Sequence, residues 1–143
     1  MKWSFIVLSM AAIVGSQSYS GSAVAQAALH IPSYPQEVSL VDEGERGFVY
    51  RETKHNLRLY THDGDSETVS TCIGSCSDAW PPLLATMNAK PVGRWTPVTR
   101  PDGSQQWAHS GMPVYMRFHD SPSEPTGDGI EGKWHLLPYT KEP

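Results

Sequence analysis

Two stretches of the sequence repeat one pattern, Tyr60–Asp65 (YTHDGD) and Tyr115–Asp120 (YMRFHD). In each stretch an aspartate follows the tyrosine after four intervening positions, and an apolar residue directly precedes the tyrosine. A tryptophan follows each aspartate at nearly the same spacing, Trp80 in the first copy and Trp134 in the second. Such self-similarity indicates two structural units of similar build, and two copies are too few for a solenoid or a propeller.

The residues around these motifs occur in short apolar runs of strand length, separated by turn residues. No stretch shows sustained helical periodicity, apart from one turn at 76–80 that Pro81 and Pro82 would end. The sequence therefore predicts an all-β fold: a small sandwich or barrel built from two β-hairpin repeats (about 47–84 and 102–137) related by a pseudo-twofold axis. The expected strands are 38–41, 47–51, 56–62, 94–99, 105–109, 113–118 and 133–137.

In the expected strand 113–118, apolar and polar residues alternate. Val114, Met116 and Phe118 are predicted to face the core, with Tyr115 and Arg117 on the water side. His109 is interpreted as a strand residue that faces water.

The repeated tyrosines and aspartates are interpreted as determinants of the fold. Tyr60 and Tyr115 each end an apolar strand, where the ring can be buried while the hydroxyl needs a hydrogen-bond partner. Asp65 and Asp120 each begin a loop, a position in which a carboxylate commonly accepts backbone N–H groups and fixes a turn. The tryptophans are expected in the core.

The N-terminal segment 1–25 predicts a secretory signal peptide. Lys2 precedes an uncharged, mostly apolar run over 3–15, and the segment ends in the small residues Ala23-Val24-Ala25. The apolar run is too short to span a bilayer, so no stable membrane anchor is expected after cleavage. We expect a periplasmic or secreted protein with an extended lead-in (26–36) and a single β domain (37–143).

The charge of the chain disfavours a nucleic-acid partner. The 143 residues carry a formal charge of −4, and the sequence contains no run of Lys or Arg that could follow a phosphate backbone. The segment 1–25 contains one basic residue, Lys2, and no acid, so its removal makes the chain more acidic still.

Both cysteines, Cys72 and Cys76, lie in the expected exported domain. An oxidising compartment favours a disulfide between them, which would fix the loop before Trp80. The alternative is a Cu(I) site, because soft thiolates bind copper and a distant histidine can complete the set. Its candidate ligands beside the cysteines are His62, His109 and Met112, with His119, His135 and Met116 also considered.

Other catalytic and metal patterns are weak. The acidic loop 120–132 departs from a calcium-binding EF-hand register, because Pro122 and Pro125 occupy positions that need an oxygen ligand and a glycine. The expected domain has no Gly-x-Ser-x-Gly and no zinc-type His-x3-His spacing. No catalytic residue and no cofactor are therefore predicted.

Three segments resemble the bacterial secreted-repeat family, described as predicted lipoproteins with a conserved Tyr-x-aromatic-x-x-Asp motif. They are Tyr60-x4-Asp65, the segment 72–84 (CIGSCSDAWPPLL) and the tail 127–135 (GDGIEGKWH). The resemblance implies an exported repeat of unknown role. Two differences stand out: His62 and Arg117 replace the motif aromatics, and no cysteine is placed for lipid attachment.

These observations predict a non-enzymatic binding or structural module of the cell envelope. Its partner would be an envelope protein or an extracellular ligand. The alternatives are a periplasmic copper-binding or redox-partner protein, and a hydrolase whose site the sequence does not reveal.

Overall fold

The computed structural model describes residues 33–121, 123–139 and 141. The expected signal peptide and residues 26–32 of the lead-in lie outside the described residues. The described part consists of short strands with almost no helix, which confirms the all-β prediction. The strands are β1 (Val38–Asp42), β2 (Phe48–Glu52), β3 (Tyr60–His62), β4 (Leu84–Ala85), β5 (Trp95–Thr99), β6 (Gln105–His109), β7 (Met112–Pro113) and β8 (Trp134–Leu136); the short helices are η1 (Gly44–Arg46), α1 (Ser75–Ala79) and η2 (Ile130–Gly132).

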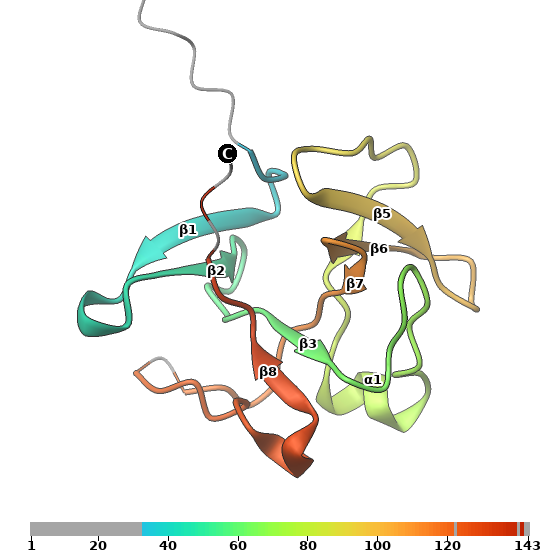
Figure 1. Ribbon diagram of the computed structural model, residues 1–143. Helices are drawn as coiled ribbons and strands as arrows, with labels where there is room; N and C mark the ends of the chain where they lie inside the picture. The colour runs from blue at the N-terminus through green and yellow to red at the C-terminus, as the bar shows by residue number, and fades with distance from the viewer. Residues whose placement is uncertain (1–32, 122, 140, 142–143) are drawn as a thin grey trace, which may run out of the picture. The chain divides into compact units, whose positions relative to one another are not determined.

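The strands form three antiparallel sheets. Strand β1 pairs with β2, β3 pairs with β8, and the third sheet has the order β4-β6-β5 with β7 also on β6. The β1–β2 hairpin and the β5–β6 hairpin lie on either side of the β3–β8 pair (Figure 1). The described strands do not close into a barrel, so that form of the predicted architecture is not found.

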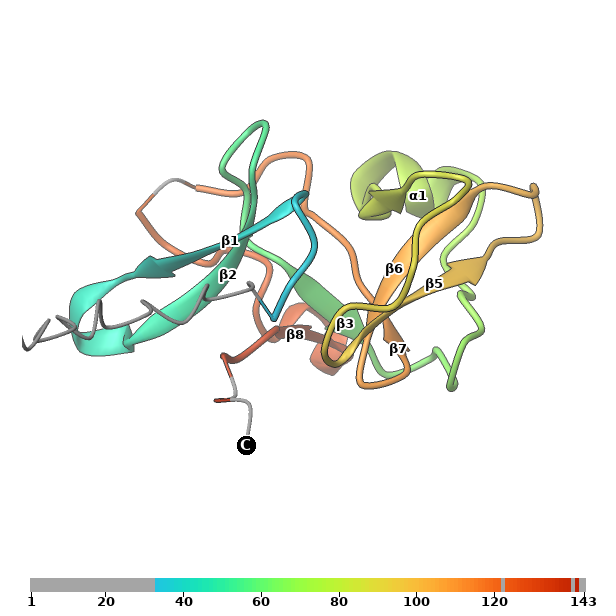
Figure 2. The same cartoon turned by 90° about the horizontal axis from the view of Figure 1, so that it is seen from above.

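The β1–β2 and β5–β6 hairpins lie on opposite sides of β3 (Figure 2). Val38 pairs with Glu52 in the first hairpin, and Trp95 pairs with His109 in the second. The two hairpins therefore have the same strand register. The segment that leads from the hairpin to the motif tyrosine is 53–59 in the first half and the shorter 110–114 in the second. The two halves therefore differ in this connection, while their hairpins and motifs correspond.

The two motif tyrosines pair with each other. Tyr60 and Tyr115 are antiparallel partners that exchange backbone hydrogen bonds of 2.8 and 2.9 Å. Each tyrosine also pairs with a residue on its other side, Tyr60 with Leu136 and Tyr115 with Pro82. The centre of the fold is thus the point where the repeats meet.

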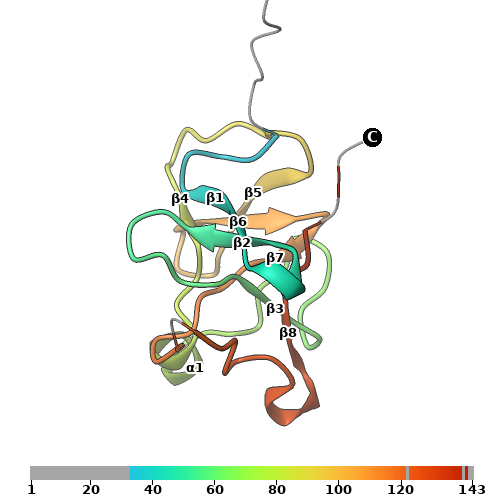
Figure 3. The same ribbon diagram turned by 90° about the vertical axis from the view of Figure 1, so that its left-hand side faces the viewer.

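Two clusters of buried residues form the core of the described part. The first holds equivalent residues of both repeats: Val38 and Trp95, Tyr50 and Trp107, Leu59 and Val114, Leu83 and Leu137. The second contains Tyr60, Tyr115, Trp80, Trp134 and Cys72. In Figure 3, α1 and the turn before β8 lie at the end of the described unit opposite the two hairpins.

The predicted alternation in 113–118 holds at Val114 and Met116, which contact the first cluster, and is wrong at Tyr115 and Phe118. Tyr115 is completely buried, whereas Phe118 is 63% exposed. The physical reason is that this segment lies between two cores: Val114 faces the first cluster and Tyr115 the second. The strand therefore has no water side at Tyr115, and it is short, since β7 ends at Pro113.

Candidate functional site

The motif tyrosine of each repeat binds the motif aspartate of the other. The Tyr60 hydroxyl donates to Asp120 Oδ2 at 2.6 Å, and the Tyr115 hydroxyl donates to Asp65 Oδ2 at 2.6 Å. A hydrogen bond to a carboxylate contributes about 1.5–3 kcal/mol to stability. These two bonds connect the repeats crosswise.

The second oxygen of each aspartate accepts from a threonine further along the same loop. Asp65 Oδ1 accepts from the backbone N–H of Thr71 at 2.8 Å and from its hydroxyl at 2.7 Å. Asp120 Oδ1 accepts from the same two groups of Thr126, both at 2.9 Å. The repeated unit is therefore Tyr-x4-Asp-x5-Thr. The threonine occurs at the same position in both copies. Extending the comparison of the two copies beyond the aspartate would therefore have identified it from the sequence.

Both tyrosines hold their protons firmly. Burial and the hydrogen bond to Asp65 raise the pKa of Tyr115 to about 12. Burial and the hydrogen bond to Asp120 raise the pKa of Tyr60 further. Each phenol therefore stays neutral near pH 7 and acts as a donor.

The motif tryptophans stack on each other. The rings of Trp80 and Trp134 have centroids 3.7 Å apart and an interplanar angle of 2°. The Tyr60 ring centroid lies 5.4 Å from that of Trp80, and the Tyr115 centroid lies 5.3 Å from that of Trp134, both in edge contact. All four rings thus form one continuous aromatic cluster in the order Tyr60, Trp80, Trp134, Tyr115.

The two residues that replace the motif aromatics contact this stack. The His62 ring lies 4.4 Å from that of Trp134, and the Arg117 guanidinium lies 5.7 Å from the centroid of Trp80. His62 and Arg117 are equivalent positions, and each contacts the tryptophan of the other repeat. A cation over an indole face is attracted by the ring quadrupole.

The tail of the second repeat approaches the cluster closely at Gly127. A Cβ atom at this position would lie 2.8 Å from the Tyr60 ring and 2.9 Å from Trp80. Only glycine fits there without displacing an aromatic ring. Cys72 holds the equivalent place in the first repeat, the position after the motif threonine, and is buried in the same cluster.

A buried arginine extends the network around Tyr115. Ser70 Oγ lies 2.7 Å from the Tyr115 hydroxyl and accepts from Arg100 Nη1 at 2.8 Å. Arg100 also donates to the Gln106 side chain at 2.7 Å and to the Cys72 carbonyl at 2.9 Å. Arg100, the residue directly after β5, thus holds the loop that follows Asp65.

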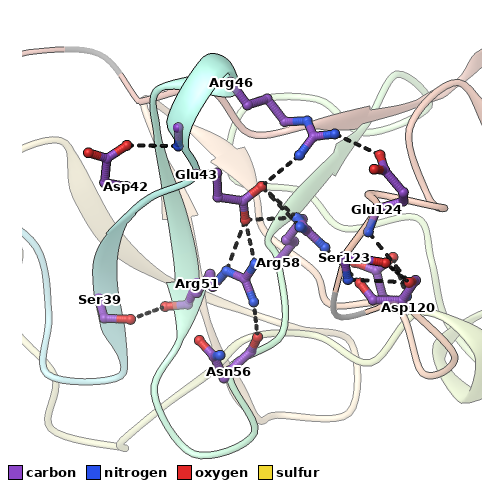
Figure 4. Close-up of polar contacts among 12 residues, drawn as sticks. Ser39, Asp42, Glu43, Arg46, Arg51, Asn56, Arg58, Asp120, Ser123 and Glu124 are labelled. Carbon is purple, nitrogen blue, oxygen red and sulfur yellow. Dashed lines mark hydrogen bonds and ion pairs between the residues drawn. The ribbon is translucent and has the colours of Figure 1, made fainter.

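The equivalent residue after β1 is an acid, Glu43. Its carboxylate lies among the side chains of Arg46, Arg51 and Arg58 (Figure 4), with Arg58 Nη2 donating at 3.0 Å. Burial alone would raise the pKa of Glu43, but the hydrogen bonds and charges of Arg58 and Arg51 outweigh it and lower that pKa. Arg58 Nη1 also donates to the Ser121 carbonyl at 2.7 Å, which holds the loop after Asp120.

Cys72 and Cys76 form a disulfide, as predicted, with an S–S distance of 1.97 Å. Both sulfur atoms are used in this bond, and a disulfide offers no thiolate to copper. His109 is buried against Tyr50 and Trp95 in the first cluster, which also makes the expectation of a water-facing His109 wrong.

The remaining metal candidates have other roles. His62 packs on Trp134, and Met112 opens strand β7. In the acidic loop, Asp128 Oδ1 accepts from the backbone N–H of Leu136 at 2.9 Å. Within the described residues, no group of three or more His, Cys, Asp or Glu side chains is arranged to hold a metal ion.

An apolar groove lies on the surface of the described part. It measures about 430 Å³ and is lined by His55, Leu57, Pro81, Met116 and Phe118. An adjoining groove of about 390 Å³ shares His55, Pro81 and Met116 with it. Both repeats contribute to this surface, which the sequence did not predict because its residues are far apart in the chain.

The family comparison matches residues 96–137 to a secreted repeat of unknown function. The chain is similar to this family over the segment that contains its second Tyr-x4-Asp motif. The matched segment begins in β5, ends one residue after β8 and contains Tyr115, Asp120 and Trp134. The comparison with curated proteins gave no match, and neither did the comparison with solved structures.

The motif contacts of the matched segment reach beyond its boundaries. Its Tyr115 hydroxyl donates to Asp65 and its Asp120 accepts from Tyr60, and both partners lie outside the matched segment. The matched segment alone therefore completes neither of these two contacts. The family description agrees with an exported protein, and no helix among the described residues is long and apolar enough to cross a membrane.

Proposed function

We propose that the protein is an exported, non-enzymatic binding module, in which two secreted repeats form a rigid frame for a binding groove. The observation that supports this proposal most directly is the use of the motif side chains within the fold. Asp65 and Asp120 each accept a phenol hydroxyl, a threonine hydroxyl and a backbone N–H. The hydrogen bonds of these carboxylates therefore stabilise the fold and connect its two halves.

The groove formed by His55, Leu57, Pro81, Met116 and Phe118 is the proposed binding surface. A concave apolar surface with few polar groups is typical of a binding site. Phe118 is 63% exposed beside this groove, and contiguous exposed apolar patches mark interaction sites more often than single apolar residues do. The proposed occupant is an apolar segment of an envelope protein, since the protein is expected to act in an exported compartment.

The test is photo-crosslinking in the exporting cell. A photoreactive phenylalanine analogue replaces Phe118, and the matched control carries it at Phe48, which is 51% exposed away from the groove. The proposal predicts a protein adduct from position 118 and none from position 48. The identified protein, once purified, should bind the wild type and lose at least about tenfold in affinity with Phe118→Ser, the range expected when one exposed aromatic anchor is removed.

Two results would contradict the proposal. One is an equal pattern of adducts at both positions. The other is unchanged affinity of the purified partner for Phe118→Ser and for a second groove variant, Met116→Gln, with both variants folded by circular dichroism.

A further inference from the structure

The aromatic cluster has a geometry that neutral rings do not prefer. Aromatic pairs favour offset or edge-to-face arrangements with centroids about 4.5–7 Å apart, because the negative ring faces repel. Trp80 and Trp134 instead lie face to face at 3.7 Å and 2°. The same overlap allows a positive charge to spread over both indoles when one electron is removed, so this arrangement favours the oxidised pair.

A tyrosine borders each end of the stacked pair. The Tyr60 centroid lies 5.4 Å from that of Trp80, and the Tyr115 centroid lies 5.3 Å from that of Trp134, so every step along the four rings is short. All four rings are buried. A radical formed here would be shielded from solvent.

Each tyrosine also has a proton acceptor. A phenol loses its proton when it is oxidised, because the phenol radical cation is a strong acid. Asp120 and Asp65 lie 2.6 Å from the Tyr60 and Tyr115 hydroxyls, within the reach that a general base needs. The tyrosyl radical is then neutral. The positive charge of Arg117 near Trp80 therefore raises the free energy of the tryptophan radical cation more than that of the tyrosyl radical. This difference favours transfer of the oxidation from the tryptophans to the tyrosines.

We propose that Tyr60, Trp80, Trp134 and Tyr115 form a relay for one-electron oxidation, with the stacked tryptophans as the entry point and the tyrosines as the end points. An outer-sphere one-electron oxidant removes an electron from the tryptophan pair and is itself reduced. An electron then moves from Tyr60 or Tyr115 to the tryptophan pair, and the phenol proton moves to Asp120 or Asp65. A one-electron donor later reduces the tyrosyl radical, and the proton returns from the aspartic acid.

The relay can be tested on the purified exported chain with photogenerated tris(bipyridine)ruthenium(III) as the oxidant. Transient absorption and electron paramagnetic resonance follow the tryptophan and tyrosyl radicals. In the wild type, a tryptophan radical should form first and decay as a tyrosyl radical appears. The matched controls are Trp107→Phe and Tyr139→Phe, aromatic residues outside the four-ring cluster, which should leave this sequence of events unchanged.

Two double variants separate the relay from simple packing. Tyr60→Phe/Tyr115→Phe keeps the rings but should leave a long-lived tryptophan radical and no tyrosyl signal from the cluster. Asp65→Asn/Asp120→Asn keeps all four rings but removes the proton acceptors, so tyrosyl formation should slow by about 100-fold, the usual contribution of a positioned base.

The proposal is overturned if tyrosyl radicals form equally fast in folded Tyr60→Phe/Tyr115→Phe, since the radical then lies on other tyrosines. It is also overturned if the asparagine variants show the wild-type rate. If a double variant does not fold, Tyr60→Phe and Tyr115→Phe are compared singly: each leaves one end point and should lower the tyrosyl yield, and an unchanged yield in both overturns the proposal.

Discussion

The crossed Tyr–Asp hydrogen bonds predict a specific pattern of energetic coupling between the repeats. Tyr115→Phe removes a hydrogen-bond partner from a buried carboxylate and from Ser70. It should therefore destabilise the protein by about 2–3 kcal/mol. Tyr60→Phe should cost about 1–2 kcal/mol, because Asp120 is partly exposed and water can replace the lost donor. In a domain of this size each kcal/mol corresponds to about 4 °C in melting temperature.

Double-mutant cycles test where the coupling lies. The crossed pairs, Tyr115 with Asp65 and Tyr60 with Asp120, should each couple by about 1–2 kcal/mol when Tyr→Phe is combined with Asp→Asn. Tyr60 and Asp65, which belong to one repeat, take part in different hydrogen bonds and should be additive within about 0.5 kcal/mol. Urea unfolding with linear extrapolation measures all four corners of each cycle. Coupling within a repeat that equals the crossed coupling would refute the reciprocal arrangement.

Three further predictions concern the stacked tryptophans, the Glu43 ion pairs and the disulfide. Trp80→Ala and Trp134→Ala should each destabilise by about 3–5 kcal/mol in urea unfolding, the usual cost of truncating a core aromatic residue. Both rings are buried, and melting temperatures close to the wild type would argue against a shared core. The pKa of Glu43 is lowered in the folded state, so its stabilisation is present above the unfolded pKa near 4.5 and is lost as pH falls through the lower folded value. Glu43→Gln should reduce the loss of unfolding free energy below about pH 4.5. The same loss at acidic pH in the variant and the wild type would contradict this. Reducing the disulfide should destabilise the protein by about 2 kcal/mol or less, because the closed loop is short. A larger loss on titration with dithiothreitol would show that the Cys72–Cys76 bond does more than fix the local loop.

The sequence predicts the repeated elements well because local patterns report local structure. The hairpin strands near 38–42, 48–52, 95–99 and 105–109 follow from apolar runs and turn residues, and α1 ends where Pro81 and Pro82 follow. The disulfide is predicted from two neighbouring cysteines and the expectation that an exported domain meets an oxidising compartment.

The contacts between the repeats cannot be read in the same way. A repeat shows that Tyr60 and Tyr115 have equivalent environments, but it does not show that each tyrosine donates to the aspartate of the other copy. The same problem affects the predicted water side at Tyr115, because alternation assumes one buried face, whereas this segment separates two cores. Glu43 and Arg100 belong to no motif, since their shared position emerges only when the hairpins are superimposed by register.

The most direct test of the crossed arrangement is the nuclear Overhauser effect from the two motif hydroxyl protons. These protons exchange slowly when they are buried in strong hydrogen bonds, and Tyr60→Phe and Tyr115→Phe assign them. The structure predicts that the Tyr60 hydroxyl proton lies near Thr126, and the Tyr115 hydroxyl proton near Thr71, because each pair shares one aspartate. Contacts from Tyr60 to Thr71 and from Tyr115 to Thr126 would mean that each repeat satisfies its own aspartate, and would contradict the account.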